Sequence, residues 1–140
     1  MFFVDTNIFL EFLLRRENTE SVLRFLEWAG EKRISLVISR FSVHAIEAIL
    51  SKTHKDTVLT IFLENLESGE NLSVYDTSTE EEKEIVKTGI SKGLDFDDAL
   101  QYYVAKKTGC IAIASFDAHF DKTGLPRKTP LQILKENSAE

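Results

Sequence analysis

The sequence contains very little cysteine, proline or glycine. Of its 140 residues, 1 is cysteine, 2 are proline and 6 are glycine. A single cysteine, Cys110, excludes an intramolecular disulfide and a zinc site built from several cysteines, and it indicates a reducing compartment. Cys110 lies in an apolar run, so we expect a buried and unreactive thiol. The scarcity of glycine and proline excludes a collagen-like or linker-rich chain.

Long apolar runs and an excess of positive charge are also missing. No stretch approaches the ~20 apolar residues of a membrane-spanning helix, and the N-terminus lacks the pattern of a signal peptide. We therefore expect a cytoplasmic protein without a membrane partner. The chain has 17 Lys and Arg against 23 Asp and Glu, a net charge of -6. This charge disfavours sequence-independent binding to a polyanion, so any nucleic acid must be held locally.

Apolar residues make up 43% of the chain and include 10 phenylalanines, which predicts one folded domain over residues 1–140. Strands are expected at 2–4, 34–38, 72–75 and 110–114, and those at 2–4 and 110–114 are expected to be buried. Helices are expected at 8–14, 19–28, 43–50, 56–66, from 79 onward, at 96–107 and over a short segment at 131–134. Thr79 and Glu82 match a capping box, and Gly109 can end a helix. This alternation predicts an α/β fold, an α/β/α sandwich around a mostly parallel central sheet.

Acidic side chains stand where several of these strands end. Asp5 and Asp117 directly follow predicted buried strands, and Asp76 follows a weaker one. Ligands of parallel sheets bind beyond the carboxyl ends of the strands. Clustered carboxylates cannot all stay ionised without a cation, and Mg2+ or Mn2+ accepts carboxylate ligands and activates water for phosphodiester cleavage. The candidate ligands are Asp5, Glu47, Asp97 or Asp98, and Asp117.

Each of these acids also has a purely structural interpretation. Asp5 can cap the helix that follows it, and Asp117 can be an ordinary loop residue. Asp97 and Asp98 can both favour the start of a helix through its dipole. Glu47 can simply be solvated on its helix. Helical periodicity does not choose between Asp97 and Asp98.

Four short motifs, in their order and spacing, resemble the PIN-domain nucleases, which include toxin ribonucleases of toxin–antitoxin pairs. They are Phe-Val-Asp-Thr-Asn at 3–7, the strand–helix junction at 39–47, Asp-Ala-Leu at 98–100 with Ala105, and Ile-Ala-Ser-Phe-Asp at 113–117 with Phe120. The resemblance extends from Phe2 to about Phe120. It implies a PIN-like fold and hydrolysis of single-stranded RNA with Mg2+ or Mn2+.

The resemblance also implies roles for particular side chains. The metal-binding and catalytic acids would be Asp5, Glu47, Asp98 and Asp117, and the Asp-Ala-Leu match favours Asp98 over its neighbour. Hydrogen bonds from Asn7 or Thr6 and from Ser115 would support the ligand carboxylates or metal-bound water. Asp121 would add an outer carboxylate.

The implied partners are an RNA substrate, an antitoxin protein and a second copy of the chain in a homodimer. Apolar residues of the early helices exceed what one side of a small sheet needs. They include Phe9, Phe12, Phe25, Leu26, Trp28, Ile61, Phe62 and Leu66. Several basic residues could guide RNA or be ordinary solvated surface. They are Arg15, Arg16, Lys52, Lys55, Lys122, Arg127 and Lys128.

Three other functions compete with a metal-dependent nuclease. A catalytically weak PIN-like module could bind RNA or a protein without cutting. An aspartyl-phosphate enzyme is disfavoured because no lysine follows the last predicted strand before Lys122. Histidine-based general acid–base catalysis is disfavoured because His44, His54 and His119 are scattered, and only His119 falls beside a proposed acid.

Overall fold

The computed structural model describes residues 1–138 of the chain. Its elements in order are β1 (Phe2–Val4), α1 (Thr6–Leu13), α2 (Thr19–Glu31), β2 (Leu36–Ser39), α3 (Arg40–Lys52), α4 (Asp56–Ser68), β3 (Leu72–Tyr75), α5 (Thr79–Lys92), α6 (Phe96–Lys107), β4 (Ala112–Ala114), the 3-10 helix η1 (Ala118–Thr123), β5 (Arg127–Lys128) and α7 (Pro130–Asn137). No helix within the described residues is long and apolar enough to cross a membrane.

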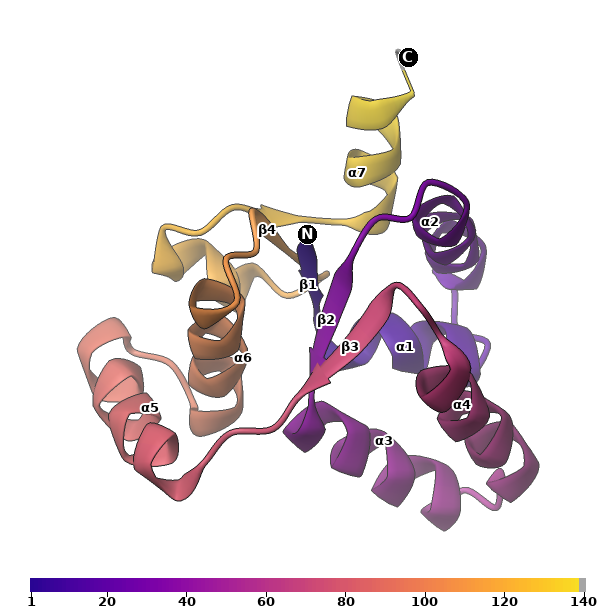
Figure 1. Ribbon diagram of the computed structural model, residues 1–140. Helices are drawn as coiled ribbons and strands as arrows, with labels where there is room; N and C mark the ends of the chain where they lie inside the picture. Colours follow the sequence, from indigo (N-terminus) through magenta and orange to yellow (C-terminus); the bar gives the residue numbers. More distant parts are fainter. Residues whose placement is uncertain (139–140) are drawn as a thin grey trace.

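The five strands form one parallel sheet in the order β3-β2-β1-β4-β5. Helices α1 to α4 lie on one side of the sheet, and α5 and α6 lie on the other (Figure 1). The predicted α/β/α sandwich is therefore confirmed. Because all strands run the same way, the residues that follow β1, β2 and β4 meet at one edge of the sheet.

Successive residues of the central strand β1 pack into two separate hydrophobic cores, one on each face of the sheet. Phe2 and Val4 pack with α1, α2 and α3, whereas Phe3 packs with α5 and α6. Val37 of β2 and Ile113 of β4 join the second core. Helices cover both faces, so side chains of both orientations must be apolar, which explains the unbroken apolar runs in the sequence.

The start of one helix and the capping residues of another differ from the sequence prediction, although α5 begins at Thr79 as expected. The helix expected at 43–50 begins at Arg40, because the Ser39 side chain accepts a hydrogen bond from the backbone N–H of Ser42. The capping box at the start of α5 consists of Ser78 and Glu81, so the prediction of Thr79 and Glu82 was wrong by one residue. Both registers fit the same sequence pattern, and the extended backbone at Ser78 selects the earlier one.

The segment after β4 has more regular structure than the sequence indicated. Arg127 and Lys128, expected in a loop, form an edge strand that is parallel to β4. A strand of two residues is too short to show a periodic pattern in the sequence. It forms because its backbone pairs with β4, and beside this pairing the N–H of Ser115 donates to the Lys128 carbonyl at 3.0 Å. The final helix α7 extends beyond the predicted 131–134, starts with a capping box at Thr129 and buries Ile133.

The turn between α6 and β4 matches the sequence prediction. Gly109 follows the end of α6 with a φ of 76°, a left-handed conformation that favours glycine. Cys110 is buried after it, and burial raises the pKa of the thiol above its usual range. The prediction of a buried cysteine is confirmed, and a raised pKa makes the reactive thiolate scarce at neutral pH.

Candidate active site

Asp5 stands directly after the central strand and is only 4% exposed. It occupies the N-cap position of α1, but its side chain makes no capping hydrogen bond. Instead, the Ser115 hydroxyl at the end of β4 donates to Asp5 Oδ2 at 2.7 Å. Ser115 Oγ also accepts from the backbone N–H of Asp117 at 2.9 Å. The hydrogen bond expected from Ser115 to an acidic side chain is thus present, and it links the ends of β1 and β4.

Asp98 and Asp117 approach each other at the same edge, together with His119. Asp98 lies in the first turn of α6 and is 9% exposed. His119 Nδ1 lies 3.1 Å from Asp117 Oδ1 and 3.6 Å from Asp98 Oδ2. One ligand atom from each of the three residues lies within 4.8 Å of the others. Two carboxylates and an imidazole at this spacing could hold one metal ion.

The charges of the cluster act on one another. Burial raises the pKa of Asp5 to about 6, and the charges of Asp97 and Asp117 add to this effect, while hydrogen bonds from Ser115 and Gln101 oppose it. Burial raises the pKa of Asp98 to about 7, reinforced by Asp97, Asp117 and Asp5. Three acids from different parts of the chain therefore form one electrostatic unit. A cation would favour their ionised forms, so the donor set fits a hard divalent ion.

Asp97 and Asp98 differ in burial, which helical periodicity did not reveal. Asp98 is buried, whereas Asp97 is exposed to solvent. Only Asp98 belongs to the group that places ligand atoms together with Asp117 and His119. Asp97 still influences the cluster through its charge.

Glu47 lies apart from this group. Its side chain on α3 is 35% exposed, and its Oε1 lies 2.7 Å from His44 Nδ1, one turn earlier on the helix. Among the described residues, the charges that raise the pKa of Asp5 and Asp98 do not include Glu47. A role for Glu47 as a ligand therefore stays a prediction that rests on the family resemblance.

Several buried polar residues behind the carboxylates were not predicted from the sequence. Gln101 is buried on the same face of α6 as Asp98, and its Oε1 accepts from the Thr6 backbone N–H at 3.3 Å. The Thr6 hydroxyl donates to Ser42 Oγ at 2.7 Å, and Ser39 Oγ donates to the same oxygen at 2.9 Å. Gln101 follows Asp98 by three residues, a spacing that places two side chains on the same face of a helix and could have identified Gln101 from the sequence. Of the alternatives Asn7 and Thr6, Asn7 is exposed, and Thr6 bonds to Gln101 and Ser42, so its expected support of a ligand carboxylate stays a prediction.

Replacing Ser115 by Ala should lower the free energy of unfolding by about 1–3 kcal/mol, because the Asp5 carboxylate and the Asp117 N–H both lose a buried partner. Chemical denaturation would measure the change. Ser115→Thr keeps the hydroxyl and should retain most of the stability. Ser35→Ala, at an exposed serine, should change it by less than about 0.5 kcal/mol. Equal stability of Ser115→Ala and Ser35→Ala would contradict the structural role of this hydroxyl.

Two of the basic residues expected to guide RNA are already paired with acids. Arg127 donates to both carboxylate oxygens of Asp121 at 3.1 and 3.0 Å, which holds the pKa of Asp121 below its usual range. Lys128 Nζ lies 2.6 Å from Glu136 Oε2. Asp121 is therefore engaged by Arg127 in this structure, and its role as an outer carboxylate stays a prediction. Because Arg127 and Lys128 are paired with acids, fewer basic side chains are left to attract RNA.

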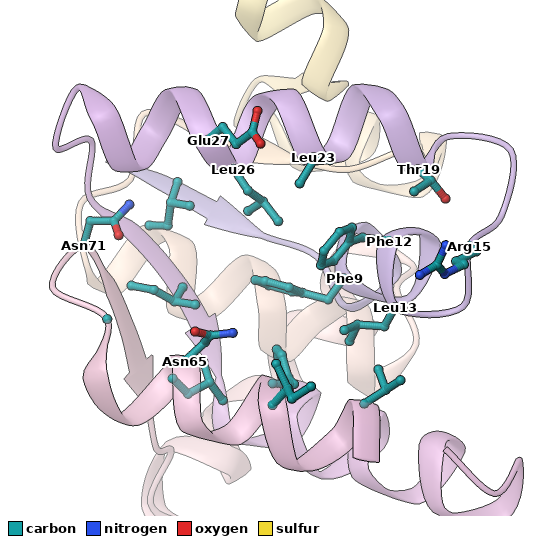
Figure 2. A pocket seen from close by; sticks show the side chains of 17 residues that line it. Phe9, Phe12, Leu13, Arg15, Thr19, Leu23, Leu26, Glu27, Asn65 and Asn71 are labelled. Carbon is teal, nitrogen blue, oxygen red and sulfur yellow. The ribbon is translucent and has the colours of Figure 1, made fainter. Parts of the chain in front are cut away.

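A separate apolar groove of about 690 Å3 lies between α1, α2 and α4 (Figure 2). Phe9 and Phe12 extend into it from α1, and Leu23 and Leu26 line it from α2. None of the clustered carboxylates lines it. Part of the apolar surplus noted in the sequence belongs to the core: Phe25 is fully buried there, and Phe9 and Phe62 are largely buried in the core while also lining the groove.

The fold and site define a class: a parallel α/β/α sandwich with an acidic cluster at the carboxyl edge of its sheet. The sequence model of the PIN domain family matches residues 2–125. The chain therefore belongs to the PIN domain family. Membership of this family supports a hydrolytic nuclease activity.

Solved structures share the fold. VapC20 from Mycobacterium tuberculosis, a sarcin-ricin loop cleaving toxin, is 17% identical with a TM-score of 0.73, covering 89% of this chain and 96% of its own. FitAcB from Neisseria gonorrhoeae is 17% identical with a TM-score of 0.65, covering 94% and 99%. VapBC2 from Rickettsia felis, bound to a DNA fragment from its promoter, is 20% identical with a TM-score of 0.68, covering 91% and 97%. No curated protein matches the sequence.

Proposed function

We propose that this protein is a Mg2+- or Mn2+-dependent endoribonuclease that hydrolyses phosphodiester bonds of single-stranded RNA, and that it acts as the toxin of a toxin–antitoxin pair. The observation that carries the proposal is the convergence of Asp5, Asp98 and Asp117 at one edge of a PIN domain. The structural neighbour that is a cleaving toxin supports the assignment.

Several of the clustered side chains would together bind the ion. Asp98 and Asp117 would supply oxygen ligands, and His119 is placed to add a nitrogen ligand. Asp5, held by Ser115, would complete the negative charge from the end of β1. Glu47 would contribute as the family resemblance implies. The bound ion supplies activation of the attacking water and stabilisation of the charge that develops on the phosphate.

We also propose that the protein acts in the cytoplasm, as a homodimer of single-domain chains, and that an antitoxin inhibits it. The apolar groove offers the antitoxin a suitable surface, because Leu23 and Ile61 are exposed on its opposite walls. An amphipathic helix that lays its apolar face into such a groove is a common mode of recognition. The VapBC2 neighbour, bound to DNA from its promoter, supports a toxin–antitoxin context.

The direct test uses the purified wild-type protein and a labelled single-stranded RNA. Cleavage is expected with Mg2+ or Mn2+, none in a chelator, and little with DNA of the same sequence. Cleavage that persists in the chelator would contradict the metal-dependent mechanism. Binding of RNA without cleavage under all metal conditions would favour the alternative of a non-cleaving PIN-like binding module.

The two neighbouring acids of α6 should respond differently to substitution. Asp98→Asn should abolish detectable cleavage, because it removes a buried ligand oxygen beside Asp117. Asp97→Asn should leave turnover near normal and change stability by no more than a few tenths of a kcal/mol, since Asp97 is exposed at a helix start. Initial cleavage rates of both variants at saturating Mn2+ would measure this, and the reverse pattern would reassign the ligand to Asp97.

A further inference from the structure

Two exposed aromatic rings lie against each other beside the acidic cluster. Phe41, in the first turn of α3, and Phe96, at the start of α6, have ring centroids 6.1 Å apart at an interplanar angle of 69°. The two residues are 40% and 38% exposed. Single exposed apolar residues are common on protein surfaces. Two large rings that come from separate helices and contact each other form an exposed apolar patch.

The position of the pair follows from residues already placed in the site. Phe96 precedes Asp98 by two residues in the first turn of α6. Phe41 is adjacent to Ser42, which accepts the hydrogen bond from Thr6, the residue after Asp5. Phe41 therefore stands at the junction between β2 and α3, and Phe96 at the junction between α5 and α6, beside residues of the sheet edge that carries the carboxylates.

In the part of the chain that the structure describes, neither ring belongs to either of the two hydrophobic cores. Helix α3 is anchored by Val43, Ile46 and Leu50, and α6 by Leu100 and Val104, all of which are fully or almost fully buried. The folded structure thus does not need an aromatic ring at position 41 or 96. A functional contact explains their exposure better than packing does.

The chemistry of a nucleobase suits this surface. Bases of single-stranded RNA stack on aromatic side chains, and this interaction needs no positive charge. The chain carries a net charge of -6, and Arg127 and Lys128 are paired with acids. Coulombic attraction to RNA is therefore weak, and stacking can supply the affinity. A hollow of about 430 Å3 beside Phe41 is lined by Arg40 and His44 but also by Asp76 and Glu82, so it adds no net positive charge for a phosphate.

We propose that Phe41 and Phe96 form an aromatic platform that stacks a nucleobase of single-stranded RNA beside the phosphate to be cleaved. The platform rests on the proposed nuclease function and makes Phe41 and Phe96 substrate-positioning residues. It also explains a preference for single strands, because the bases of a duplex are already stacked within it.

The first test separates binding from turnover in the full-length protein. Phe41→Ala and Phe96→Ala should each raise KM for a single-stranded RNA roughly 5- to 100-fold, with a smaller change in kcat, as expected for the loss of one stacking contact. Phe41→Leu should behave like Phe41→Ala, and Phe41→Tyr should behave like the wild type, since only the tyrosine keeps a ring. The control Ile90→Ala, at an exposed apolar residue of α5, should leave KM unchanged.

A second measurement identifies the base and does not need catalysis. Fluorescence anisotropy would compare the affinity of labelled RNAs that carry one abasic position each. In the wild type, one abasic position should weaken binding, and in Phe41→Ala the same position should have no further effect. This coupling is measurable even if the wild type fails to cleave, so failure of the nuclease proposal and failure of the platform are distinguishable.

Two results would overturn the platform. The first is a pair of folded variants, Phe41→Ala and Phe96→Ala, that bind and cleave RNA like the wild type while an Asp5 variant is inactive. The second is a change from dimer to monomer in sedimentation for both variants with RNA affinity per chain retained, which would assign the ring pair to the contact between two copies.

Discussion

Asp5→Asn should reduce metal-dependent RNA cleavage by at least about 100-fold. The substitution keeps the shape of the side chain and an acceptor for the Ser115 hydroxyl, but it removes the negative charge at the end of β1. Losing residues that only orient metal ligands costs about 10- to 100-fold in affinity or activity, so losing a ligand charge should cost at least as much. Initial rates on a labelled single-stranded RNA at fixed Mn2+ would measure the loss.

Two further variants make this expectation specific. Asp117→Asn should cause a loss of similar size, because Asp117 faces Asp98 and His119 in the same cluster. Asp76→Asn should retain activity, since Asp76 is exposed after β3 and does not belong to the cluster. Equal loss in all three variants would indicate a general effect of charge, and full activity of Asp5→Asn would remove Asp5 from the proposed mechanism.

Divalent metal should raise the melting temperature of the wild type at neutral pH. Without an ion, the ionised carboxylates of Asp5, Asp98 and Asp117 repel one another in a poorly solvated site. Binding to the folded state alone stabilises it by about 2.7 kcal/mol at a hundredfold excess over Kd, or roughly 5 to 10 °C in a domain of this size. Thermal scans with Mn2+ and with a chelator would measure the shift.

The pH dependence of the metal-free protein has a defined sign. The pKa of Asp5 is about 6 and that of Asp98 about 7 in the folded state, against an ordinary value of 3.8. Between about pH 4 and pH 7 the folded state therefore holds protons that the unfolded chain has released. The free energy of unfolding falls as the pH rises through this window, by about 3 kcal/mol from Asp5 alone.

Asp5→Asn should respond differently from the wild type to pH in a chelator and to added metal. Above pH 7 the variant should melt at a higher temperature than the wild type, because it lacks the buried charge. Its melting temperature should also rise less on addition of Mn2+. Identical metal-induced shifts in the two proteins would exclude a metal site that depends on Asp5. For the wild type, the shift should shrink as the pH falls towards 5, because protons compete with the metal for the carboxylates.

The sequence alone determined the architecture and the edge at which the site lies. Unbroken apolar runs such as Phe2–Val4 occur where helices cover both faces of a strand, and their alternation with helical patterns implies a parallel sheet. The carboxyl ends of parallel strands share an edge, so the positions of Asp5 and Asp117 just beyond the ends of two such strands are enough to bring them to the same edge. These inferences depend on local pattern and on general rules of topology.

Which side chains meet at that edge depends on how the helices pack against the sheet. The tertiary structure buries Asp98 and exposes Asp97, adds His119 and Gln101 to the site, and places Glu47 beside His44. The physical reason is that these contacts depend on how far each helix rotates and slides against the sheet. A rotation of one residue, about 100°, changes which of two adjacent acids is buried, and helical periodicity leaves that rotation undetermined when a helix is apolar on more than one side.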